Sequence, residues 1–131
     1  YDPEQCKCMI EIPDHGEYCY KATCYATTRL LASRLDLKRA SYSTSFQSRL
    51  TRNWLPPFTE MVLGELPGKG CKNVLVVAPS FVADCLETLI EIKSEYGDMF
   101  NKSGGAKLEL AGSLNDNDEW VEAIIKIAGL S

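Results

Sequence analysis

The amino-acid sequence predicts an α/β domain with a parallel sheet flanked by helices, and three observations support this class. Residues 74–77 (VLVV) are a continuous β-branched and aliphatic run, which is typical of a parallel strand covered on both faces. A stretch with helical periodicity, residues 80–96, follows this run directly. A further strand-like run, residues 107–111, comes after the helix. Strands that alternate with helices in this way favour a parallel sheet.

Length and composition exclude several classes of protein. The 131 residues suggest one domain that is large enough to build a core. The formal charge of -4 argues against a nucleic-acid-binding surface. No apolar run approaches the roughly 20 residues that span a bilayer, so no transmembrane segment is expected, and a peripheral membrane contact stays open. Because the sequence begins at Tyr1 rather than Met, we expect a piece of a longer polypeptide.

Three elements are expected before the central strand. Residues 22–35 predict a packing helix, because apolar residues recur in them at helical spacing: Ala26, Leu30, Leu31 and Leu35. Residues 42–47 alternate loosely and predict a strand that ends near Phe46. After a polar, proline-rich loop, residues 58–66 predict a short helix.

The helix after the central strand is expected to begin at Ser80, whose hydroxyl can cap it. Its packing side is expected to hold Val82, Cys85, Leu86, Leu89 and Ile92. Cys71 and Cys85 are both interpreted as small buried hydrophobes. The Ser103-Gly104-Gly105 breaker ends this region, and residues 119–127 predict a last helix with Trp120, Ile124 and Ile127 on its packing side.

Acidic side chains gather on another side of the helix predicted over residues 80–96. Asp84, Glu87 and Glu91 follow the spacing i, i+3, i+7, and Glu95 continues their line. One interpretation is a solvated face whose first acids suit the positive end of the helix dipole. The other interpretation is functional, because ligands of open α/β sheets bind outside the carboxyl ends of the strands, where this line begins. Carboxylates in a row can hold a hard divalent cation or accept protons.

Four of the six cysteines lie in residues 1–25, in a C-x-C-x10-C-x4-C array: Cys6, Cys8, Cys19 and Cys24. This segment has little apolar periodicity, so the thiols indicate a metal or cluster that replaces a core. The spacing is not the paired form of a zinc ribbon, and cysteine-only sets also suit an iron–sulfur cluster. Two disulfides stay open for an exported chain. We therefore divide the chain into a cysteine-rich segment (1–25) and an α/β domain (26–131).

The segment FVADCLETLIEI, residues 81–92, closely resembles a helix of the ferrochelatases, the enzymes that insert ferrous iron into a porphyrin at the end of haem synthesis. Its acids Asp84, Glu87 and Glu91 match family positions one by one. Three more blocks occur in the family's order: SFQSR (45–49), WLPP followed by Thr59-Glu60, and SGG with SLND (113–116). The resemblance covers essentially the whole chain.

The resemblance implies a chelatase-like, Rossmann- or flavodoxin-like parallel sheet that forms the carboxyl-terminal half of a two-domain enzyme. It implies a cleft for a flat tetrapyrrole, no organic cofactor, and Fe²⁺ insertion into protoporphyrin IX or a close porphyrin. The partner of the chain would be the amino-terminal half of the same enzyme. The family's histidine block belongs upstream of this region. A cytoplasmic location follows, with a membrane-associated one left open.

The family also implies roles for individual residues. Glu87 would be the main acid–base or metal-relay residue, assisted by Asp84 and Glu91, with Glu87 and Glu91 on the iron path. Trp54, Arg49 and Ser48 would seat the porphyrin. Some bacterial members carry a [2Fe–2S] cluster in a cysteine-rich insertion near this place, which implies that the cluster is held by Cys6, Cys8, Cys19 and Cys24.

Two departures and two alternatives remain. Relatives usually have one more residue before the tryptophan that matches Trp54. Most relatives also have an acid where this chain has Lys93, so either the helix is irregular, as the family's π-type turn would allow, or the lysine reaches outward to water. The first alternative function is an iron–sulfur module that binds or regulates without catalysis. The second is a chelatase for another metal or tetrapyrrole.

Overall fold

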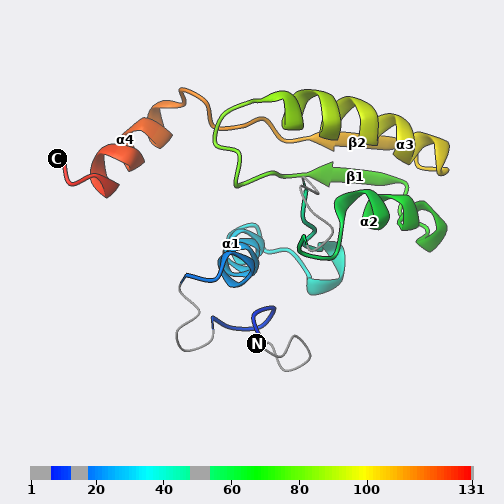
Figure 1. Ribbon diagram of the computed structural model, residues 1–131, viewed down its shortest axis with the longest axis horizontal. Helices are drawn as coiled ribbons and strands as arrows, with labels where there is room; N and C mark the ends of the chain where they lie inside the picture. Colours follow the sequence, from blue (N-terminus) through cyan, green and yellow to red (C-terminus); the bar gives the residue numbers. More distant parts are fainter. Residues whose placement is uncertain (1–6, 13–17, 48–53, 131) are drawn as a thin grey trace. The chain divides into compact units, whose positions relative to one another are not determined.

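The computed structural model describes residues 7–12, 18–47 and 54–130 (Figure 1). In these ranges the elements are α1 (Tyr20–Arg34), η2 (Arg39–Ser41), α2 (Thr59–Glu65), η3 (Pro67–Lys69), β1 (Asn73–Val76), η4 (Glu87–Tyr96), α3 (Gly97–Lys102), β2 (Lys107–Leu110) and α4 (Asp118–Ile127). The chain forms two compact units, residues 1–59 and 60–131, and each is described by itself. The predicted boundary at residue 25 stays a prediction. No described helix is both long and apolar enough to cross a membrane.

The first unit is built around one face of α1. Cys8, Ala22, Tyr25 and Phe46 form its buried cluster, and the rings of Tyr25 and Phe46 meet edge to face with centroids 5.9 Å apart. Arg29 on α1 donates from Nη1 to the carbonyl oxygen of Met9 at 2.9 Å. The described part of the amino-terminal segment is therefore tied to α1 by packing and by a hydrogen bond.

The predicted helix over residues 22–35 is confirmed, but its predicted packing face is wrong. The side chains that α1 buries are Ala22, Tyr25 and Ala32. By contrast, Leu30 and Leu35 are more than half exposed. The reason is that the cluster around Phe46 contacts the turn that carries Ala22 and Tyr25, so the leucines have no apolar cover from the described residues.

The strand predicted over residues 42–47 is reduced to a single parallel bridge between Phe46 and Phe58. Phe46 donates to the carbonyl oxygen of Pro57 at 2.9 Å, and its own carbonyl accepts from the Thr59 N–H at 3.2 Å. The next bond of a parallel ladder would need an N–H from Pro57, and proline has none. The pairing therefore stops after one residue.

The second unit confirms the predicted α/β class with a two-stranded parallel sheet. β1 pairs with β2 in the register Val74↔Leu108 and Val76↔Leu110. These inward side chains are half-buried beneath η4 and α3, which lie along one face of the sheet in Figure 1. The predicted cover on both faces is wrong for the described residues, because Leu75, on the opposite face, is 64% exposed.

The turn that leads into β2 depends on two glycines. Gly104 has φ +92°, a backbone conformation that favours glycine. Gly105 lies directly against the ring of Phe100, which is fully buried, and a Cβ there would collide with that ring. The Ser-Gly-Gly block thus lets the chain reverse tightly around the Phe100 ring and enter the sheet.

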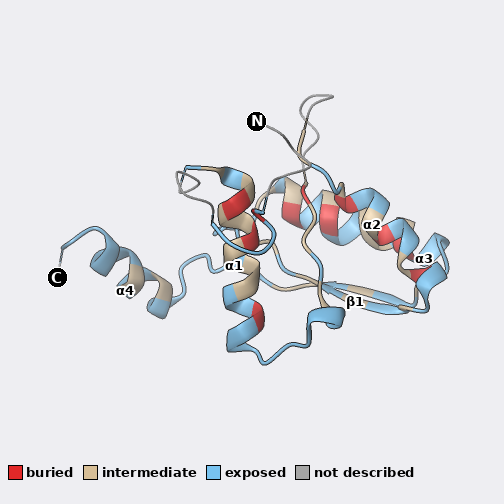
Figure 2. Ribbon diagram, turned by 90° about the horizontal axis from the view of Figure 1, so that it is seen from below, coloured by how far each residue is buried: buried red, intermediate tan, exposed pale blue. Residues whose placement is uncertain are grey.

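The last helix, α4, begins where the sequence predicts it. The side chain of Asn117 caps the helix by accepting from the N–H of Trp120 at 3.1 Å. The predicted packing side is wrong for the described residues, because α4 buries none of its side chains and Ile127 is 80% exposed (Figure 2). The apolar spacing of the helix is as predicted, but no described element covers it.

Candidate functional site

The helix that carries the acids begins later than its sequence predicts. It starts at Glu87, with Leu86 in the capping position, so the prediction that Ser80 caps it is wrong. The hydroxyl of Thr88, which is fully buried, accepts from the Cys85 N–H at 2.9 Å and donates to the Cys85 carbonyl at 3.0 Å. This reciprocal pair fixes the entry of the helix. Asp84 therefore lies on the connection before the helix, and not on the helix as predicted.

This helix, η4, is a π-helix along its whole length. Its backbone bonds close from i to i+5, so side chains five residues apart come to the same side. Tyr96 accordingly donates its hydroxyl to Oε1 of Glu91 at 3.2 Å, a contact that the wider turn makes available. The interpretation of an irregular helix around Lys93 is confirmed, and Lys93 is exposed.

Asp84 lies where the connections after β1 and β2 meet. Its Oδ2 accepts from Nδ2 of Asn115 at 3.0 Å. Hydrogen bonds from the Asn115 amide, and next from the Ser113 hydroxyl, hold the pKa of the Asp84 carboxyl below its usual value. Both connections leave the carboxyl ends of their strands, which is the edge where an open α/β sheet places its ligands.

Glu87 occupies the first turn of η4 and is half-buried. Its own backbone N–H, and next the Cys85 thiol, donate to the carboxylate and lower the pKa of Glu87. The interpretation of Cys85 as a small buried hydrophobe is wrong, because Cys85 is half-buried. Its thiol also acts as a polar group that lowers the pKa of Glu87. Cys71 is half-buried as well, with its thiol 3.4 Å from the carbonyl oxygen of Asn73.

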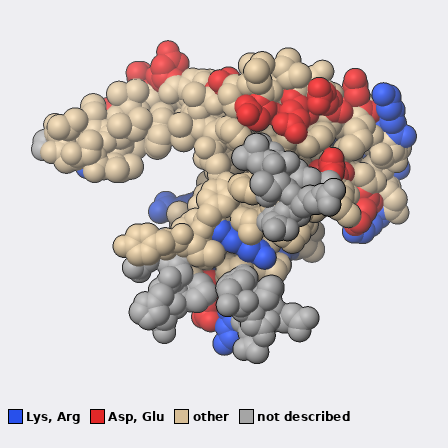
Figure 3. All heavy atoms as spheres, in the orientation of Figure 1, with Lys and Arg blue, Asp and Glu red and all other residues tan. Residues whose placement is uncertain are grey.

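The acids of this region lie at the surface. Asp84 and Glu95 are exposed and Glu87 and Glu91 are half-buried, so all four carboxylates reach solvent. Figure 3 shows acidic side chains gathered in a row over η4. Ionised carboxylates in such a row can hold and pass on a divalent cation or accept protons.

Three residues are implied by resemblance to bind a substrate, and they belong to the first unit. Trp54 is half-buried and donates its indole Nε1–H to the Gln47 carbonyl at 2.7 Å. Its ring also packs against Tyr20, with centroids 6.4 Å apart. Ser48 and Arg49 lie outside the described residues. Nothing in the described part of this unit tests their roles.

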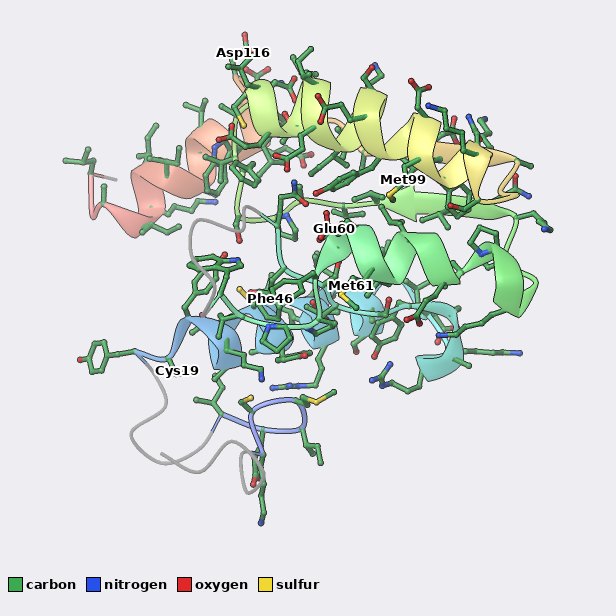
Figure 4. The ribbon with its side chains drawn as sticks, turned by 45° about the vertical axis from the view of Figure 1, so that its right-hand side comes forward. Cys19, Phe46, Glu60, Met61, Met99 and Asp116 are labelled. Atoms are coloured by element: carbon green, nitrogen blue, oxygen red, sulfur yellow. The ribbon has the colours of Figure 1, made fainter. Side chains whose placement is uncertain are left out.

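Three of the four cysteines in the array belong to the core of the first unit. Cys8 is buried in the cluster with Phe46, and Cys19 and Cys24 pack against that cluster as half-buried side chains; Cys19 and Phe46 are labelled in Figure 4. Cys19 and Cys24 are free thiols. Within the described ranges no three His, Cys, Asp or Glu side chains form a group that could hold a metal ion. Cys6, the fourth member of the array, lies outside these ranges.

Sequence reasoning did not single out Asn115, Tyr96 or Cys85 as site residues. Asn115 lies in the SLND block, so its position in a matched motif was a usable signal. The contact from Tyr96 to Glu91 depends on π-helical spacing, which an α-helical projection does not reproduce.

Comparisons with known proteins agree with the four sequence blocks. A family model described as Ferrochelatase matches residues 8–129. The ferrochelatase of Legionella pneumophila (strain Corby) is 44% identical over 126 residues, which are 95% of this chain and 37% of that protein. The ferrochelatase of Coxiella burnetii (strain Dugway 5J108-111) is 46% identical over 118 residues, which are 89% of this chain and 33% of that protein. The chain thus spans about a third of the length of these curated relatives.

Proposed function

The chain belongs to the ferrochelatase family, and from this premise we propose that it is the carboxyl-terminal part of an enzyme that inserts Fe²⁺ into protoporphyrin IX or a close porphyrin. The reaction exchanges one ferrous ion for two pyrrole protons. The proposed location is the cytoplasm, with a peripheral membrane contact left open. The longer polypeptide that includes this chain is called the parent below.

One observation carries the proposal: Asp84, Glu87 and Glu91 lie in succession from the carboxyl edge of the sheet along η4. Each has a hydrogen-bond donor of its own, from Asn115, Cys85 and Tyr96 respectively. The lowered pKa values of Asp84 and Glu87 show that their surroundings favour the charged form of both carboxyls. An ionised carboxylate attracts Fe²⁺ and can accept a proton that metal insertion releases.

We assign the roles accordingly. Glu87 is the main acid–base or metal-relay residue, because it stands at the start of η4, beside the connection that carries Asp84. Asp84 and Glu91 assist it, and Glu87 with Glu91 forms the iron path. Trp54 offers an aromatic surface to the macrocycle, while Arg49 and Ser48 would hold its carboxylates.

The proposed partner of this chain is the amino-terminal half of the same enzyme. The support is length, since the curated relatives are nearly three times as long as the matched segment. That half would supply the opposing wall of the porphyrin cleft and the family's histidine block. A non-catalytic module would need neither.

The direct test of the function is a metal-insertion assay on the purified parent without oxygen. Fe²⁺ and protoporphyrin IX are expected to give haem. Its formation is monitored as the replacement of the absorption spectrum of free porphyrin by that of haem. Parallel assays with Co²⁺, Zn²⁺ and Mg²⁺ address the alternative of another metal. A parent that binds porphyrin but inserts none of these ions would reject the enzyme and favour the binding or regulatory module.

We also propose that Cys6, Cys8, Cys19 and Cys24 hold a [2Fe–2S] cluster. The donor set fits in kind, because the three described members are cysteines that lie in or against one small cluster beside α1. A cluster there would tie the cysteine-rich segment to α1 and contribute to its folding free energy.

Parent protein made with iron and kept from oxygen is expected to show visible charge-transfer absorption and about two irons per chain. Cys19→Ser should remove this absorption, whereas Cys71→Ser, outside the array, should keep it. A colourless protein with one zinc, or two disulfides among the four cysteines, would contradict the proposal.

A further inference from the structure

Asn115 makes an unusually complete set of contacts with the connection that precedes η4. Its Oδ1 accepts from the Asp84 backbone N–H at 2.9 Å, and its Nδ2 donates to Asp84 Oδ2 at 3.0 Å. The same Nδ2 lies 3.3 Å from the Ser113 carbonyl oxygen. The backbone N–H of Asn115 donates to the Val82 carbonyl at 2.8 Å. The side chain of Asn115 therefore hydrogen-bonds both the main chain and the carboxylate of Asp84.

The chemistry of this position suits asparagine. The backbone of Asn115 has φ +48°, a left-handed conformation that asparagine and aspartate tolerate better than other side chains. The contacts require one acceptor and one donor on the same short side chain, which is what a carboxamide provides. Aspartate could accept but not donate and would repel Asp84, whereas glycine would suit the backbone and make neither side-chain contact.

The position of Asp84 depends on Asn115 because Asp84 lies in the connection over residues 77–86. It contains no strand and at most one helical residue at its end, so regular secondary structure does not fix Asp84. Asp84 is exposed, so burial does not fix it either. Besides Asn115 and Ser113, the charged side chain that acts on its carboxylate is Lys93 on η4, which attracts it.

We infer that Asn115 is a positioning residue of the acidic site: it holds the Asp84 carboxylate at the carboxyl edge of the sheet, next to the start of the helix that carries Glu87 and Glu91. The inference deepens the proposed function and rests on it for the role of Asp84. The contacts themselves do not depend on the reaction. Asn115 acts through Asp84 and does not touch the reacting atoms.

The test uses the full-length parent with Asn115→Gly, Asn115→Asp and the control Asn117→Asp. Asn117 lies two residues away and caps α4, and aspartate caps as well as asparagine does. The Asp84 carboxyl is titrated by ¹³C NMR with aspartate labelled at the carboxyl carbon, and its signal is assigned by its loss in Asp84→Asn. The apparent pKa of Asp84 is expected to rise in Asn115→Gly and to rise further in Asn115→Asp, where a like charge is added. Asn117→Asp should leave it unchanged.

Turnover gives the second readout. In the Asn115 variants the KM for Fe²⁺ should rise by about tenfold, the low end for losing an outer partner of a ligand, with the acid limb of the pH profile moved to higher pH. A purely structural role of Asn115 would lower thermal stability without raising the pKa of Asp84 in Asn115→Gly and raising it further in Asn115→Asp. Equal Asp84 pKa values in the parent and both Asn115 variants would overturn the inference. If instead Asp84→Asn left turnover unchanged, Asp84 would drop out of the proposed function, and the titration would still decide whether Asn115 holds it.

Discussion

Replacement of Glu87 by glutamine in the full-length parent is expected to slow the chemical step by roughly 10²- to 10⁴-fold, the range for losing an acid–base group. Glutamine keeps the size of the side chain and an oxygen that can still accept from the Glu87 backbone N–H and the Cys85 thiol. The fold and porphyrin binding should therefore survive. What is lost is the negative charge at the start of η4 that attracts Fe²⁺ and accepts a proton.

The matched control is Glu122→Gln on α4, an exposed acid for which we propose no role. Both variants are compared with the parent by single-turnover insertion of Fe²⁺ into protoporphyrin, with circular dichroism to verify folding. If Glu87 only decorated a solvated helix face, both changes would alter stability by no more than about 0.5 kcal/mol and neither would alter rate. Equal rates in two well-folded variants would remove the acidic row from the mechanism.

The isolated chain of 131 residues is expected to show no sustained iron insertion, which is the largest loss of activity that we predict. It spans about a third of the length of its curated relatives, and we propose that the opposing wall of the cleft and the histidine block belong to the remainder. Proximity and a second set of catalytic groups would both be absent.

The assay is anaerobic incubation of the purified chain with Fe²⁺ and protoporphyrin, beside the parent at the same concentration. Recovery of insertion when the separately produced amino-terminal half is added would support a shared active site. Steady turnover by the chain alone would contradict the proposal that it is only part of the enzyme.

Local sequence signals located most of the elements. The run over residues 74–77 and the strand-like run over residues 107–111 became β1 and β2, and the helix predicted over residues 119–127 became α4. Such signals act within a few residues. They did not reveal which side of α1 is covered or that Leu75 and Ile127 are exposed, because these depend on what packs against each element.

The site shows the same division. Asp84, Glu87 and Glu91 were identified from spacing and resemblance, and the structure places them in succession near one sheet edge. The prediction that the helix begins at Ser80 put Asp84 on the helix, which is wrong because Thr88 and Cys85 fix the helix entry after it. The contact from Asn115 comes from a distant loop, and the contact from Tyr96 depends on π-helical spacing, so helical periodicity around the acids predicts neither contact.

The π-helix makes the number of residues between Glu87 and Tyr96 matter as much as their identity. Removal of one residue inside η4, with the π-helical turns kept, would rotate every later side chain around the axis by somewhat less than the roughly 100° of one α-helical residue. A substitution alters one contact, whereas an insertion or deletion here would change the direction of all side chains beyond it, Tyr96 included. Relatives whose alignment with this chain has a gap inside this segment would therefore present a different surface here, even where the acids on either side of the gap were identical.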